Sequence, residues 1–132
     1  MYGRDETDWN ELVAEAVDFL AAQARLARLT TYTELNTVLT QRTGQQAFDF
    51  SRESDRAAMG GLLGAAVDQT LSDIGAMISS IVIYLNANDA GPGFYKLATE
   101  LGLLSTKPTV LEKEAFWAGQ VRKVHEHYSR RT

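Results

Sequence analysis

Residues 77–85, with the sequence MISSIVIYL, form a dense run of β-branched and other apolar side chains. Such residues favour strands because they pack well on a pleated surface. Because the run is apolar on both faces, it predicts a central strand whose side chains are largely buried. The spacing of apolar residues elsewhere is mostly that of helices. One good strand among several helices constrains the chain to a mainly helical α+β fold.

Five segments have the apolar spacing of helices: 8–28, 34–42, 55–70, 94–102 and 110–129. Residues 30–32 are β-formers and add a short extended segment before the second helix.

Capping residues predict where these helices begin and end. Asp8 with Glu11 has the form of a capping box for the first helix, and Thr33 is the expected N-cap of the second, which ends at Gly44. Ser51 or Ser54 is the expected N-cap of the third.

Three helices followed by a strand and a turn match the order of a winged helix-turn-helix. The 132 residues fit one domain, with a core over 8–102 and an added C-terminal helix over 110–129. We therefore expect a single winged-helix-like domain with one or two extra C-terminal helices.

Composition excludes several classes of protein. The absence of cysteine excludes disulfides, thiol nucleophiles and thiolate metal sites. The net charge of −4 argues against strong non-specific nucleic-acid binding across the whole surface, although it permits a local basic patch. The acidic, polar N-terminus is unlike a signal peptide, and no apolar run is long enough for a bilayer. We expect a cytoplasmic protein with no membrane contact; the oligomeric state is left open.

The usual catalytic patterns are missing. His125 and His127 are two residues apart, so a helix directs them to different faces and they make a poor metal pair. Ser79 and Ser80 lack the G-x-S-x-G turn of a nucleophilic serine. We expect no metal, no cofactor and no catalysis.

Gly60, Gly61 and Gly64 lie inside the third predicted helix, where each glycine costs about 1 kcal/mol relative to alanine. We expect at least one of them to pack against another backbone. The alternative is close approach to a nucleic-acid backbone.

A glycine-proline turn over 86–93 follows the predicted strand and leads into the next helix. We expect Phe94 to fold back onto the core and Tyr95 to stay nearer the surface. Lys96 lies in the first turn of that helix, whose positive end can bind phosphate. The turn is either a plain corner or a ligand contact.

Basic residues gather in two places. Arg52 and Arg56 flank the start of the third predicted helix, and the C-terminus holds Arg122, Lys123, Arg130 and Arg131. Both groups are either solvated helix ends or phosphate contacts on either side of a recognition helix.

The segments TTYTELN and DRAAMGGLLG, followed by a strand and a glycine-bearing turn, resemble the DNA-binding domain of alkylguanine-DNA alkyltransferases and alkyltransferase-like proteins. The resemblance spans residues 12–98. It implies that Tyr32 corresponds to the family tyrosine that helps turn out a nucleotide, and that Gly60 corresponds to the glycine of the helix that enters the minor groove. Ala57 takes the place of the family's intercalating arginine, with Arg56 one position earlier.

Residues 78–83, ISSIVI, take the place of the family's P-C-H-R-V-V segment. The reactive cysteine is missing, so alkyl transfer is excluded. The chain also resembles small bacterial proteins with a Y-x-E-L segment and a G-x-L-L-G helix, which implies no function.

Two functions remain. The first is a non-enzymatic nucleic-acid-binding module for double-stranded DNA, with contacts from Tyr32, Arg52, Arg56, Gly60 and Lys96. The second is a protein-protein interaction module, such as a small regulatory or immunity-type partner, which the acidic composition favours.

Overall fold

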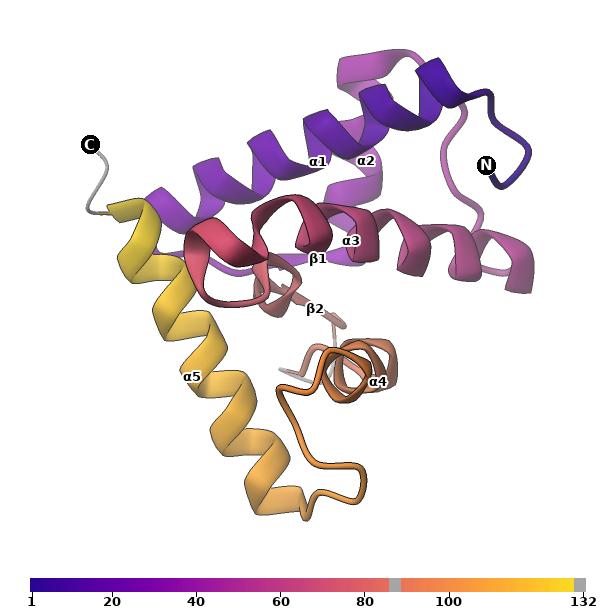
Figure 1. The fold of residues 1–132 in the computed structure, drawn as a ribbon. Helices are drawn as coiled ribbons and strands as arrows, with labels where there is room; N and C mark the ends of the chain where they lie inside the picture. Colours follow the sequence, from indigo (N-terminus) through magenta and orange to yellow (C-terminus); the bar gives the residue numbers. More distant parts are fainter. Residues whose placement is uncertain (86–88, 130–132) are drawn as a thin grey trace.

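The computed structural model describes residues 1–85 and 89–129, and the fold is mainly helical α+β (Figure 1). The elements, in chain order, are α1 (Glu6–Arg25), β1 (Thr30–Thr31), α2 (Tyr32–Thr43), α3 (Glu53–Ile74), a 3₁₀ helix η1 (Ile78–Ile81), β2 (Val82–Ile83), α4 (Pro92–Glu100) and α5 (Val110–Ser129). The predicted order of helices therefore holds, as does the C-terminal helix. None of the helices in the described part of the chain is long and apolar enough to cross a bilayer.

The predicted helix starts are wrong by two residues. Asp5, rather than Asp8, is the N-cap of α1, and its carboxylate accepts a hydrogen bond from the Asp8 amide at 2.7 Å. Thr31, rather than Thr33, caps α2 and accepts from the Glu34 amide at 3.0 Å. Each helix therefore begins two residues earlier than expected, because an earlier side-chain oxygen accepts from the free amides.

The start of α3 also differs from the prediction. Arg52 is its N-cap residue and makes no side-chain capping bond, so neither Ser51 nor Ser54 caps it. The helix extends to Ile74 and ends at Gly75, which adopts a left-handed conformation at φ 74°. Three interior glycines do not shorten it, since tertiary packing of its apolar face outweighs their weak helix propensity.

The predicted nine-residue strand is wrong, although its burial is right. Residues 78–81 form the 3₁₀ helix η1, and only Val82 and Ile83 pair as β2, in parallel with Thr30 and Thr31. A strand needs a partner for its backbone groups, and β1 offers only two residues. The apolar run is therefore used as a buried connection through the core, with residues 78–82 fully buried or nearly so.

Helix α5 satisfies the backbone of this buried run. The Gln120 side-chain oxygen accepts from the Met77 amide at 2.7 Å, and the Trp117 indole N–H donates to the Ser80 carbonyl at 2.8 Å. Buried backbone groups without partners are costly, so these two bonds explain how a non-helical, non-sheet segment lies in the centre of the domain.

The core lies among α1, α3, α5 and η1, with α1 above α3 and α5 crossing one end of the pair in Figure 1. Helix α4 lies on the other side of α3 from α1 (Figure 1). Phe94 is buried against Phe116 and Tyr95 is half-buried, as predicted. The predicted turn over 86–93 is only partly testable, because residues 86–88 lie outside the described residues.

Candidate functional site

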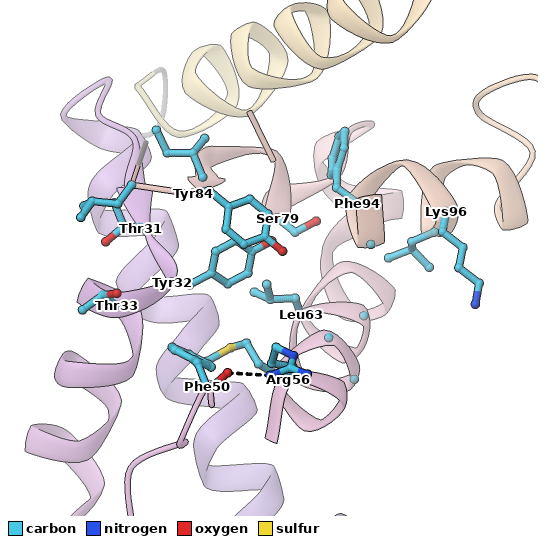
Figure 2. A pocket seen from close by; sticks show the side chains of 18 of the residues that line it. Thr31, Tyr32, Thr33, Phe50, Arg56, Leu63, Ser79, Tyr84, Phe94 and Lys96 are labelled. Atoms are coloured by element: carbon cyan, nitrogen blue, oxygen red, sulfur yellow. Dashed lines mark hydrogen bonds between the residues drawn. The ribbon is translucent and has the colours of Figure 1, made fainter. Parts of the chain in front are cut away.

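A groove of about 840 Å³ opens beside the N-terminal half of α3. Its walls come from the start of α2, the end of β2 and helix α4, and their side chains are mainly aromatic and aliphatic (Figure 2). Tyr2, from the N-terminal residues, completes the lining. The apolar lining comprises Tyr2, Phe50, Met59, Leu63, Ile83, Tyr84, Leu85, Phe94 and Leu97. This volume is that of a site for a small organic group.

Two stacked tyrosines dominate one wall. The rings of Tyr32 and Tyr84 lie 4.8 Å apart between centroids and are inclined at 37° (Figure 2). Tyr84 also lies directly on Gly91, where an added Cβ would come within 2.0 Å of the ring. Although held on these two sides, Tyr84 remains 48% exposed. A fixed and half-exposed aromatic ring is available for contact with a ligand.

The hydroxyl of Tyr32 ties this wall to the segment that enters α4. It donates to the Ala90 carbonyl at 2.9 Å. Burial raises the pKa of Tyr32 above its ordinary value, and the nearby Tyr84 and Asp89 raise it further. The hydroxyl therefore stays protonated at neutral pH and acts as a positioned donor rather than as a general base.

Two cationic side chains line the groove. The guanidinium of Arg56 donates to the Phe50 carbonyl at 2.8 Å, which leaves its other N–H groups for a ligand. Lys96 extends from α4 with its ammonium directed away from the two tyrosines (Figure 2). Arg52, at the start of α3, is exposed and does not line the groove.

The glycines of α3 make room for the groove. Among the described residues, no atom lies within 4 Å of a Cβ added at Gly60 or Gly64, so both face open space. A Cβ at Gly61 would lie 2.6 Å from the Tyr2 hydroxyl. The expectation that one of the three packs against backbone is therefore wrong. The close neighbour is an aromatic side chain, and the open pair lets a ligand approach the helix backbone.

Ser79 contributes a buried polar group to the lining (Figure 2). The residue is 5% exposed, and its hydroxyl oxygen has no hydrogen-bond partner within residues 1–85 and 89–129. A buried hydroxyl without a partner is unfavourable. Sequence reasoning set Ser79 aside as a strand residue, whereas η1 brings it to the groove.

A second hollow, of about 720 Å³, lies between the start of α4 and α5. There the Tyr95 hydroxyl donates to the Asp89 carboxylate at 2.7 Å, and the Lys113 ammonium lies 5.5 Å from the centre of the Tyr95 ring. Burial, followed by the negative Asp89, raises the pKa of Tyr95. These groups bind one another, so this hollow has less to offer a ligand than the groove beside α3.

The structure thus brings four of the five sequence-predicted site residues, Tyr32, Arg56, Gly60 and Lys96, to one groove, and leaves Arg52 outside it. Sequence reasoning missed Tyr84 and Tyr2 as groove residues. Tyr84 was read as the end of a buried strand, although an aromatic just before a polar turn was a usable signal. In the C-terminal basic group, Arg130 and Arg131 lie outside the described residues.

Within the described chain, no three histidine, cysteine, aspartate or glutamate side chains gather as a potential metal site. His125 instead lies 3.0 Å from the Arg28 carbonyl, and His127 lies 3.3 Å from Asp73. Comparison with protein-family models, curated protein sequences and solved structures found no match.

Proposed function

We propose that the protein is a non-enzymatic nucleic-acid-binding module of winged-helix type, whose groove accepts a base displaced from double-stranded DNA. The observation that carries the proposal is the convergence of Tyr32, Arg56, Gly60 and Lys96, from three separate helices, around the exposed ring of Tyr84.

The aromatic wall supports a role in stacking. Proteins that hold unpaired bases place aromatic rings beside cationic groups, because every base has a π-face and every nucleotide carries a phosphate. Tyr84 offers an exposed face that Tyr32 and Gly91 keep in position. The unpartnered hydroxyl of Ser79 offers a hydrogen bond to a polar edge of the base.

The charges support weak, salt-dependent contacts with phosphate. Arg56 and Lys96 supply two cations at the groove, and Arg52 supplies a third at the start of α3. Against a net charge of −4, three cations provide little long-range attraction. The base in the groove therefore has to contribute much of the affinity, and binding should be strongest where a base is already unpaired.

The arrangement of the helices also supports the binding of a nucleic acid along α3. We assign α2 and α3 to a helix-turn-helix-like pair, with the glycine-bearing half of α3 as the recognition helix. Open space over Gly60 and Gly64 would allow a sugar-phosphate backbone to approach α3 closely.

The resemblance to alkyltransferase-like proteins is consistent with this proposal. It assigns Tyr32 to the tyrosine that helps turn out a nucleotide and Ser79 to the position of the reactive cysteine, and both residues line the same groove. A serine hydroxyl is a far poorer nucleophile than a thiolate, so the module binds without transferring an alkyl group.

Fluorescence anisotropy with labelled DNA tests the proposal. A duplex with one extrahelical nucleotide should bind more tightly than the fully paired duplex at about 50 mM salt. The protein does not have to break the pairing and stacking of that nucleotide, because it already lies outside the duplex. Arg56→Ala and Lys96→Ala should each reduce the slope of log affinity against log salt by about one. Arg25→Ala, on the exposed surface of α1 away from the groove, is the matched control. No binding to either duplex at this salt concentration would refute the proposal.

The alternative is a protein-protein interaction module, and one observation favours it. Leu85, at the rim of the groove, is 74% exposed next to the half-exposed Tyr84. An apolar rim of this kind also suits a protein partner. A protein complex at this site would be weakened by Leu85→Asp and would depend little on salt, whereas DNA binding would depend strongly on salt.

A further inference from the structure

The first four residues form a tight turn with an unusual backbone. The Arg4 amide donates to the Met1 carbonyl at 3.0 Å, and both central residues, Tyr2 at φ 53° and Gly3 at φ 79°, are left-handed. Glycine adopts this conformation freely, but a tyrosine does not, because its Cβ crowds the backbone. Other contacts must therefore hold Tyr2 in this conformation.

Arg4 supplies those contacts. Its guanidinium donates to the Gln45 side-chain oxygen at 2.9 Å and to the Gln46 carbonyl at 2.7 Å. It also lies 4.8 Å from the centre of the Phe48 ring, and Phe48 is buried. The N-terminal turn is thereby attached to the connection between α2 and α3, next to the first turn of α1 (Figure 1).

The turn places the Tyr2 ring on the glycine face of α3. The hydroxyl lies where a Cβ at Gly61 would be only 2.6 Å away, so any other residue at position 61 would displace the ring. The ring also lies 5.2 Å from that of Trp9, which it helps to cover.

Packing alone does not account for Tyr2. It remains 52% exposed and lines the groove together with Gly60 and Gly64. Its hydroxyl makes no hydrogen bond within the described part of the chain. A residue that is held in a strained conformation, is half-exposed and lines a groove indicates a functional constraint.

We propose that Tyr2 is a ligand-contacting residue, a second aromatic wall that stacks on the base in the groove, and that Arg4 is the positioning residue that holds it there. This inference rests on the proposed function. It adds a contact from the extreme N-terminal part of the chain, 30 residues before Tyr32.

The test compares affinities for the duplex with one extrahelical nucleotide. Tyr2→Ala and Tyr2→Leu should each weaken binding about 5- to 20-fold, the lower part of the range for loss of one aromatic-base stack. Tyr2→Leu keeps apolar cover over Trp9 and therefore separates stacking from packing. Tyr2→Phe keeps the ring and removes only the hydroxyl, so it should retain more affinity than Tyr2→Leu. Leu111→Ala, 77% exposed on α5, is the control and should change nothing.

Gly61→Ala provides a second test, because it keeps every contacting side chain while its added Cβ displaces the Tyr2 ring. It should weaken binding as much as Tyr2→Ala does, and the double variant should lose little more, since both changes remove the same contact. Arg4→Ala should also weaken binding, because Arg4 holds the turn that carries Tyr2. Circular-dichroism melting of each variant identifies any that unfold.

The outcomes separate the two proposals. If Tyr2→Leu and Gly61→Ala are folded and bind the duplex with the affinity of the wild type, the role of Tyr2 is wrong and the proposed function still stands. A wild-type protein that binds no duplex would overturn both. Loss of affinity in Tyr2→Leu and Gly61→Ala, with a smaller loss in Tyr2→Phe, would support the second aromatic wall.

Discussion

Gly91 and Gly93 lie two residues apart at the start of α4, and alanine should have opposite effects at the two positions. Gly91 is the N-cap residue, with φ 87° and ψ 173°, a region that is almost closed to residues with a Cβ. An added Cβ would also lie 2.0 Å from a ring carbon of Tyr84. Gly93 is exposed and lies inside the helix, and no described atom is within 4 Å of its added Cβ.

The magnitudes follow from these two environments. Gly91→Ala should lower the free energy of unfolding by about 1 to 3 kcal/mol from backbone strain alone, and the Tyr84 ring must also move away. Gly93→Ala should raise it by about 0.5 to 1 kcal/mol, because alanine is the better helix former. For a domain of this size about 1 kcal/mol corresponds to roughly 4 °C in Tm.

Urea denaturation followed by circular dichroism measures both variants under the same conditions. Because Tyr84 loses its support against Gly91, the first variant should also bind the extrahelical-nucleotide duplex more weakly. Equal stabilities for the two variants, or a more stable Gly91→Ala, would show that the turn is not held as described and would remove the basis for a fixed Tyr84 wall.

Three further substitutions test the core and its buried bonds, each by urea denaturation. Phe94→Ala should lower the free energy of unfolding by about 3 to 5 kcal/mol, because the ring is buried against Phe116; a loss below 1 kcal/mol would contradict that burial. Gln120→Ala should cost about 1 to 3 kcal/mol by leaving the buried Met77 amide unpaired, and a free energy of unfolding equal to that of the wild type would show that the amide does not need this acceptor. Tyr32→Phe should cost about 0.5 to 1.5 kcal/mol through loss of the bond to Ala90, and an unchanged stability would argue against that bond.

Much of the local structure could be predicted from the sequence. The α5 boundaries, the helix end at Gly44, the extended pair Thr30–Thr31 and the burial of Phe94 all follow from patterns within a few residues. Apolar spacing and turn residues act over such short distances, so the sequence alone is enough to predict them.

The predictions of the long strand and of the packing of the α3 glycines failed because they depended on a distant partner. The run over 77–85 has the composition of a strand, but its pairing is limited by the two residues of β1, some 50 positions earlier. The close neighbour of Gly61 is Tyr2, which lies 59 positions away in the sequence. Neither partner is visible in a local pattern.

The sequence by itself determined the residue types available to the site: two cations, a helix with glycines, several tyrosines and no thiol. Only the tertiary structure decided which of them meet. Tyr84 stacks on Tyr32 because parallel pairing of β1 with β2 brings the ends of the two strands together. Gly60 and Gly64 open onto the same space because α3 packs its other face against α1. The groove forms where segments far apart in the chain come together, and packing of the core fixes the positions of these segments.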